Sequence, residues 1–209
     1  VLFFFIAFTS SSRILRCPTS DNKCYCSEFG EVEIQCPRFE PRIYVRVQPN
    51  NFLNIECENV TNEDYSLIPE MTISDAQMIK IVKCPMIPGR SLATYFQNLN
   101  VEKILWLQIF STGANSRNRL ERSQLTGFEE ITRFLLSGLE GEFADLPSDL
   151  FNNLTKVSWV TIRVIGIQLP ADLFKPLENL EFLELGHNKM NSLEPGLFKN
   201  NRKLQRLNL

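Results

Sequence analysis

The chain has 209 residues, of which 44% are hydrophobic and 22% are charged, and its formal net charge is −2. This composition is typical of an ordinary soluble fold. It argues against nucleic acid as a partner, because the chain has no excess of basic residues that could neutralise phosphates.

Residues 1–8 are all apolar, and the small residues Thr9, Ser10, Ser11 and Ser12 follow them. This pattern is typical of the hydrophobic core and cleavage zone of a signal peptide, and the apolar run is too short to span a bilayer. The alternative is a buried N-terminal strand. No initiator Met and no basic segment precede the run, so we expect residues 1–16 to be a truncated signal peptide. The N-terminal part of the protein would then lie outside the cell.

Six cysteines follow, and all of them lie within residues 17–84. They are Cys17, Cys24, Cys26, Cys36, Cys57 and Cys84. An even number of cysteines behind a signal peptide predicts a disulfide framework, and several pairings stay open. A bond between Cys24 and Cys26 is disfavoured, because one intervening residue holds them in poor geometry. Zinc sites usually space their cysteines more widely, so we expect neither a metal nor a cofactor.

Residues 17–100 are interpreted as a cysteine-rich N-terminal cap. A repeat coil buries its apolar face only against its neighbours, so the first coil needs a cover. Residues 31–36 and 43–47 alternate as half-buried strands do, and residues 79–82 form a further apolar run before Cys84. Cross-links would help to hold a cap of this size together.

Residues 101–209 carry a repeated apolar pattern. Ile131, Val157, Leu180 and Leu204 begin its successive copies, and they are 26, 23 and 24 residues apart. A period in the twenties with the skeleton LxxLxLxxN is typical of a leucine-rich repeat. The predicted core of the last copies consists of Leu180, Leu183, Leu185, Asn188, Leu193, Phe198, Leu204, Leu207 and Leu209.

Asn188 is expected to turn inward and bond the backbone of the neighbouring coil, because its amide offers both a donor and an acceptor. Ile165 and Leu139 replace it in the two preceding coils, which lose that bond. In the first aligned coil a strand starting at Phe134 is an alternative to one starting at Ile131. We prefer Ile131, because it keeps Ile131, Phe134 and Leu136 on one face.

Further upstream, Val101, Ile104, Leu107 and Ile109 fit the same pattern, and the polar residues 111–124 are interpreted as a surface insertion. The predicted fold is therefore an α/β leucine-rich repeat solenoid. Parallel strands line its concave face, irregular or short helical segments form its convex side, and a disulfide-bonded cap covers its N-terminal end.

The cysteine pattern up to Cys36 and Pro37 resembles the N-terminal cap of extracellular leucine-rich repeat proteins. Residues 45–50, 55–61 and 78–85 resemble the start of the insect Toll receptors, in which an extended cap carries an extra cysteine pair before irregular first repeats. The resemblance covers residues 17–209. It implies the disulfides Cys17–Cys26, Cys24–Cys36 and Cys57–Cys84.

Two Asn-x-Thr sequons, at Asn59 and Asn153, are candidate N-glycosylation sites in a secreted protein. Asn153 falls outside the predicted strands, which leaves the strand face of its coil free.

Catalytic patterns are absent from the sequence. None of the motifs GxGxxG, Walker A, HExxH or GxSxG occurs, and His187 is the only histidine. The cysteines are assigned to bridges, so a Cys–His pair is not expected, and the acidic pair Glu129 and Glu130 is interpreted as solvated charge. The sequence indicates that the protein is not an enzyme.

Function is expected on the strand face, where side chains between the leucines project outward. Aromatic and arginine side chains on a rigid surface are typical of binding hot spots. For Trp159 the alternative is a lateral contact with a neighbouring coil, and for His187 it is a neutral, uninvolved side chain. The candidate ligand-binding residues are Arg133, Trp159, Thr161, Arg163, Glu181, Phe182, Glu184, His187 and Arg206.

The resemblance implies the ectodomain of a single-pass type I receptor on the extracellular side of the plasma membrane. Its implied partners are a Spätzle-like cystine-knot cytokine and a second receptor chain, which together trigger innate immune or developmental signalling. The sequence stops within a strand at Leu209 without a C-terminal cap, so we expect a fragment whose membrane attachment lies in a segment outside it. The alternative is a secreted matrix or adhesion protein of the leucine-rich class without a signalling role.

Overall fold

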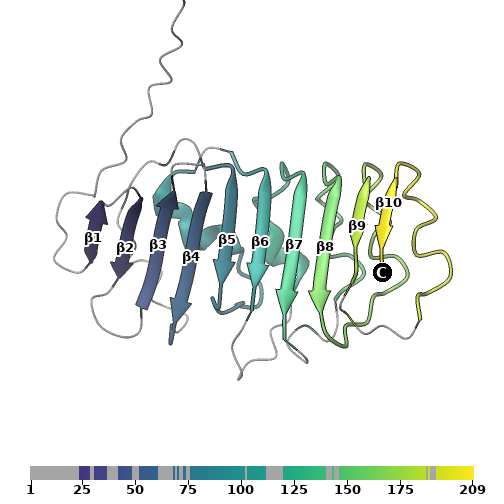
Figure 1. Ribbon diagram of the computed structural model, residues 1–209, viewed down its shortest axis with the longest axis horizontal. Coiled ribbons are helices and arrows are strands. Elements are labelled where there is room, and N and C mark those ends of the chain that lie inside the picture. Colours follow the sequence, from purple (N-terminus) through teal and green to yellow (C-terminus); the bar gives the residue numbers. More distant parts are fainter. Residues whose placement is uncertain are drawn as a thin grey trace, which may run out of the picture.

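In a computed structural model, the described residues form one sheet of ten strands, whose order in space follows their order in the sequence (Figure 1). The structure describes residues 24–28, 31–36, 42–48, 52–60, 68, 70, 73, 76–101, 103–111, 120–139, 143, 146–186, 188 and 192–209. The expected signal peptide, Cys17 and His187 lie outside these residues.

The strands are β1 (Tyr25–Glu28), β2 (Val32–Cys36), β3 (Arg42–Gln48), β4 (Phe52–Glu58), β5 (Met78–Val82), β6 (Trp106–Phe110), β7 (Arg133–Gly138), β8 (Trp159–Val164), β9 (Phe182–Glu184) and β10 (Arg206–Asn208). Within the described residues, the 3-10 helices η2 (Leu92–Leu99) and η3 (Arg122–Leu125) lie with the turns behind the sheet (Figure 1). The fold is thus the predicted leucine-rich repeat solenoid, with strands on one side and turns and short helices on the other.

The pairing of the strands changes once along the sheet, from antiparallel to parallel. β1 to β4 pair antiparallel, as short connections allow, whereas β4 to β10 pair parallel. Parallel neighbours need a crossover, and the turn segments behind the sheet supply it. The change falls at β4, inside residues 17–100; the division of the chain at residue 100 stays a prediction.

The strand register confirms the spacing of the repeats. Arg133 of β7 pairs with Trp159 of β8, Trp159 with Phe182 of β9, and Phe182 with Arg206 of β10. These offsets are the spacings of the four predicted strand starts. Phe134 pairs with Val160, and Ile131 is fully buried just ahead of β7, which confirms the preferred alignment of that coil.

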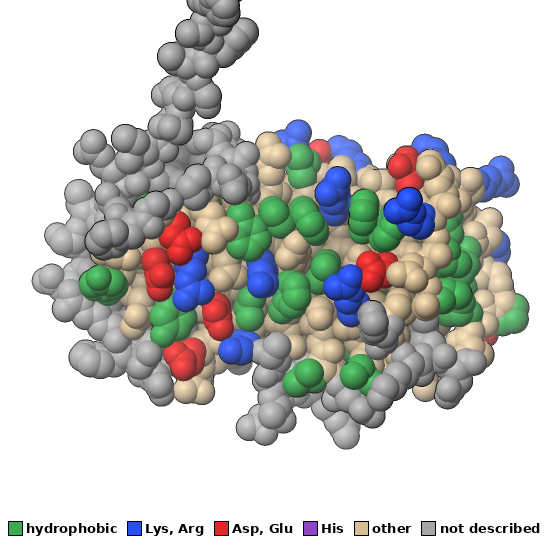
Figure 2. Space-filling model, viewed as in Figure 1, with side chains coloured by type: hydrophobic (Ala, Val, Ile, Leu, Met, Phe, Trp, Pro, Cys, Tyr) green, Lys and Arg blue, Asp and Glu red, His purple; other side chains and the backbone are tan. Residues whose placement is uncertain are grey.

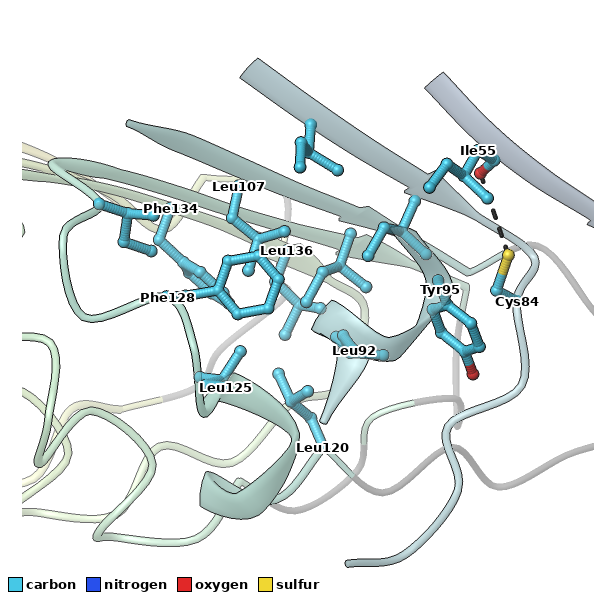
Figure 3. Packing of buried hydrophobic residues seen from close by; sticks show 14 of the residues in the cluster. Ile55, Cys84, Leu92, Tyr95, Leu107, Leu120, Leu125, Phe128, Phe134 and Leu136 are labelled. Atoms are coloured by element: carbon cyan, nitrogen blue, oxygen red, sulfur yellow. Dashed lines mark hydrogen bonds between the residues drawn. The ribbon is translucent and has the colours of Figure 1, made fainter. Parts of the chain in front are cut away.

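The core lies between the sheet and the turn segments. Leu107, Phe134, Val160 and Leu183, which are in register on four neighbouring strands, are all fully buried. Figure 3 shows Leu107 and Leu136 of the sheet meeting Phe128 from the turn side. A column of phenylalanines continues along that side: the ring centroids of Phe151 and Phe174 lie 6.2 Å apart, and those of Phe174 and Phe198 lie 6.1 Å apart.

Two buried asparagines join neighbouring coils. As predicted, Asn188 bonds the preceding coil: its Nδ2 donates to the carbonyl oxygen of Ile162 at 2.8 Å, and its Oδ1 accepts from the amide of Val164 at 2.5 Å. Asn201 also bonds the preceding coil, on the turn side and only as a donor: its Nδ2 donates to the carbonyl oxygens of Phe174 and Leu177. Side-chain amides therefore supply hydrogen bonds where the coils have no strand pairing.

The predicted core residues do not all reach the interior. Leu180, Leu183, Leu185 and Asn188 are buried, whereas Leu193, Phe198 and Leu204 are half-buried. Leu207 and Leu209 were expected in the core and are exposed, because β10 is the last strand of the sheet and no described coil packs against its far side.

Two disulfides close the N-terminal end. Cys24 is bonded to Cys36, which ties β1 to β2, and Cys57 is bonded to Cys84, which ties β4 to the segment after β5. Cys26 is also disulfide-bonded. Cys17, the partner that the resemblance implies for it, lies outside the described residues, so that pairing stays a prediction.

Candidate functional site

The outward face of the sheet carries the candidate site. Side chains alternate along each strand, so that every second one points away from the core. From β5 to β10 these outward positions form three rows, because the strands are in register. The first row holds Met78, Trp106, Arg133, Trp159, Phe182 and Arg206; the second holds Lys80, Gln108, Leu135, Thr161, Glu184 and Asn208; the third holds Val82, Phe110, Ser137 and Arg163.

Five side chains of the first row touch in sequence, and we call them the aromatic–arginine row. The Cζ atom of Arg133 lies 5.4 Å from the ring centroid of Trp106 and 5.2 Å from that of Trp159. The ring of Trp159 stacks on that of Phe182 at 3.9 Å, and Arg206 lies over Phe182 at 5.8 Å. Cation–π and stacking contacts thus run without a gap from β6 to β10.

Trp159 has features of both predicted roles, a lateral contact with a neighbouring coil and an exposed binding residue. It makes the lateral contact with its neighbour, because it stacks on Phe182 and its Nε1 donates to Oγ1 of Thr161 at 3.2 Å. It is nevertheless 38% exposed, so part of the indole faces solvent. Thr161 itself is buried under this contact. The packing holds the indole in one orientation, which lowers the entropy that a binding partner would have to remove.

The other predicted residues are spread over the same face. Arg163 is paired with Glu184, through Nη2 at 2.6 Å and Nε at 3.0 Å to the same Oε1. Glu181 is exposed directly before β9, at the edge of the outward face. Trp106 and Lys80 are additional residues that the sequence did not single out.

Charge divides the outward face into two parts (Figure 2). Over the cap the charges compensate one another, since Arg46 pairs with both Glu33 and Glu56, and Lys83 also pairs with Glu56. Over β5 to β8 the outward positions hold Lys80, Arg133 and Arg163 and no acidic residue. Lys80 lies 4.6 Å from the ring centroid of Phe110. Hydrophobic and basic side chains therefore share this second part.

Both sequon asparagines are exposed and lie off the strands. Asn59 follows β4 with a positive φ of 53°. Asn153 lies in the turns between β7 and β8, where its Oδ1 accepts from Nη2 of Arg122 at 2.9 Å. That bond uses the amide oxygen, and a glycan is attached through the amide nitrogen. A glycan on Asn153 would start on the turn side of its coil, away from the outward face.

Other kinds of site have little support within the part of the chain that the structure describes. No group of His, Cys, Asp and Glu side chains there could hold a metal ion. A groove on the turn side is lined mostly by exposed polar side chains, among them Asp149, Asp172, Lys175 and Glu178. Among the described helices, none has the length and apolar character that crossing a membrane requires.

Comparison with known proteins agrees with this architecture. Residues 167–209 match the family described as "Leucine rich repeat". Over 175 residues the chain is 28% identical to Protein toll of Drosophila melanogaster, an alignment that covers 81% of this chain and 16% of that protein.

Two solved structures of the Drosophila Toll–Spätzle complex superimpose on the chain. One matches with a TM-score of 0.77 at 24% identity and covers 89% of this chain and 25% of the other. The glycosylated form matches with the same TM-score at 25% identity and covers 91% of this chain and 26% of the other. The chain therefore spans about a quarter of those solved chains and less of the curated relative.

These findings confirm the resemblance that the sequence suggested. The chain is similar to a stretch of the leucine-rich repeat ectodomain of Toll, both in sequence and in the arrangement of its coils.

Proposed function

We propose that this Toll-type leucine-rich repeat segment recognises a protein ligand, a cystine-knot cytokine of the Spätzle type. Binding would bring the chain together with a second receptor chain and so trigger innate immune or developmental signalling. The receptor would stand on the extracellular side of the plasma membrane, attached through a segment outside this sequence. Support comes from the similarity to Toll, whose solved structures contain Spätzle.

The outward face is the surface we propose for this contact, and the aromatic–arginine row is the observation that carries the proposal. Tryptophan and arginine are enriched among the residues that dominate binding energy. Their contribution is largest when a rigid scaffold holds the side chains in place. Here Trp159 and Phe182 stack across neighbouring strands, and arginines flank them on both sides. The turn side offers no comparable exposed cluster among the described residues, and Asn153, one of the two proposed glycan sites, lies there.

A binding assay of the disulfide-intact chain against the processed cytokine tests the proposal, with surface plasmon resonance as the readout. We expect Trp159→Ala to weaken binding by tenfold or more, about 1.4 kcal/mol, because hot-spot truncations cost at least that much. Arg163→Glu is expected to weaken it as well, since it reverses a charge on the outward face and places two carboxylates together at Glu184.

Arg122→Gln is the matched control. Arg122 is an exposed arginine on η3, on the turn side, and its loss changes the net charge without touching the outward face. We expect its affinity to equal that of the unchanged chain. Equal affinity in Trp159→Ala and Arg163→Glu would exclude the outward face of these coils. No binding by the unchanged chain would favour the alternative, a secreted matrix or adhesion protein of the same fold.

A further inference from the structure

We propose that Arg133 is a receptor for a carboxylate, and that the protein ligand places an aspartate or glutamate side chain there, between Trp106 and Trp159. The inference rests on the proposed function, because the carboxylate belongs to the protein ligand. It adds the chemistry of the contact and the residue of this chain that makes it.

The position of the guanidinium is the first reason. Arg133 lies on β7, the strand between β6 and β8, and its Cζ is within 5.4 Å of the indole centroid on either side. Two rings on neighbouring strands thus limit the directions in which this side chain can move. The N–H groups of its guanidinium make no hydrogen bond or ion pair with any residue that the structure describes, and the side chain is exposed. The planar guanidinium of Arg133 is thus held in place, and its several hydrogen-bond donors are available to a ligand.

A comparison within the same face is the second reason. Arg163, on the next strand, already has a carboxylate, because Glu184 accepts from both its Nε and its Nη2. For Arg133 the outward positions of β5 to β8 supply no acidic residue at all. The cations over the cap are neutralised by Glu33 and Glu56 in the same way. Among the residues that the structure describes, Arg133 is therefore a cation of this face with no carboxylate beside it, so that another molecule can supply one.

The surroundings favour a carboxylate on a protein over a free ion. Arginine binds carboxylates through two parallel hydrogen bonds, which fix orientation as well as charge. The two indoles, with Leu135 on the same strand, offer apolar surface around that contact. An acidic side chain flanked by apolar neighbours would exclude water there, which strengthens the ion pair. A sulfated glycan would meet the charge but would leave the indoles and Leu135 without apolar partners.

A titration of the full, disulfide-intact chain tests the carboxylate directly and without the cytokine. The probes are two capped peptides, Ac-Leu-Glu-Leu-NH2 and Ac-Leu-Gln-Leu-NH2, which differ only in the charge of the central residue. NMR of the arginine Nε–Hε groups is the readout, with the Arg133 signal assigned by its loss in Arg133→Lys. We expect the Glu peptide to shift that signal saturably, with at least fivefold tighter binding than the Gln peptide.

Three results would overturn the proposal. The first is equal binding of the two peptides, and the second is the absence of a saturable shift with the Glu peptide. The third is a shift by a heparin-derived disaccharide that the Glu peptide cannot produce, which would identify a sulfated glycan as the partner.

A second measurement separates this proposal from the function on which it rests. With the processed cytokine as the probe, we expect Arg133→Gln and Arg133→Lys each to weaken binding about tenfold, since lysine keeps the charge and loses the two-pronged geometry. Arg122→Gln, the same chemical change on the turn side, is expected to leave the affinity unchanged. If Arg133→Lys bound the cytokine with full affinity, the proposed pair of hydrogen bonds from Arg133 to a carboxylate would be wrong. A cytokine that does not bind the unchanged chain would refute the proposed function, and the peptide titration would still decide the role of Arg133.

Discussion

Removing the side-chain amide of Asn188 should destabilise the solenoid more than the small size of that group suggests. β9 ends at Glu184, so its pairing with β8 covers only Trp159 to Thr161 of that strand. Beyond that point the Asn188 side chain supplies the hydrogen bonds that strand pairing no longer makes, because it bonds the carbonyl of Ile162 and the amide of Val164. Asn188→Ala leaves these two backbone groups without that partner.

The magnitude follows from the burial of those groups. Ile162 and Val164 are both fully buried, so water cannot replace the missing bonds at either position. An unsatisfied buried backbone group costs about 1–3 kcal/mol. These two groups, together with the buried carbonyl of Leu185 that Nδ2 also bonds, give a loss of about 3 kcal/mol or more in the free energy of unfolding, allowing for partial relaxation. Asn188→Asp should cost at least as much, because it keeps the acceptor for Val164 but turns a carboxylate oxygen towards the carbonyl of Ile162.

Urea unfolding followed by tryptophan fluorescence provides the assay, because Trp106 and Trp159 are the only two tryptophans and both lie on the sheet. A loss of about 3 kcal/mol lowers the urea midpoint by about 1 M or more. Hydrogen exchange adds a local readout: the protection of the Val164 amide should fall about 100-fold. Asn208→Ala, the same change at an exposed position of β10, is the control and should alter stability by less than about 0.5 kcal/mol. A change that small in Asn188→Ala, with Val164 still protected, would refute the reasoning.

Two further predictions concern the cap and the glycans. The Cys57–Cys84 bridge joins residues 27 apart and the Cys24–Cys36 bridge residues 12 apart. Loop entropy therefore predicts that the double change Cys57→Ser and Cys84→Ser lowers the free energy of unfolding by about 3.5 kcal/mol. The double change at Cys24 and Cys36 should lower it by somewhat less. Urea unfolding of both variants measures the two losses, and the reverse order would contradict the prediction. For the chain secreted from insect cells, Thr155→Ala should remove one N-glycan, and mass spectrometry before and after enzymatic deglycosylation checks this; an unchanged mass would show that Asn153 is unoccupied.

The solenoid could be predicted from the sequence because its cause is periodic. Each coil must bring its apolar residues to the same place against the last coil, so Leu183, Val160 and Phe134 recur at the spacing that the strand register shows. Asn188 could be predicted for a similar reason, since a polar residue in an apolar skeleton has to satisfy its amide within the protein. Both predictions concern residues whose neighbours belong to the repeat itself.

The cap and the full extent of the outward face could not be predicted in the same way. β1 and β4 were not expected as strands, because the pairing of an antiparallel cap depends on its turns and bridges and leaves no fixed period in the sequence. Trp106 could have been placed on this face, since Leu107 and Ile109 were aligned with the repeat, but its contact with Arg133, 27 residues on, is visible only in the strand register. Outward positions follow no hydrophobic rule, so their contacts become visible only when the strand register is known.

The contacts that make the outward face a candidate for binding also hold the coils together, so stability and affinity have to be separated by magnitude. Trp159→Ala removes one stacked aromatic pair, one cation–π contact and the hydrogen bond to Thr161, each worth about 1 kcal/mol. Because a domain of this size is stable by several kcal/mol, such a loss leaves nearly all molecules folded. The unfolded fraction can therefore lower the apparent affinity only slightly. A tenfold loss of affinity in the same variant would therefore have to come from contacts between the indole and the ligand. Comparing the loss of stability with the loss of affinity in Trp159→Ala decides whether the aromatic–arginine row is a binding surface as well as a structural one.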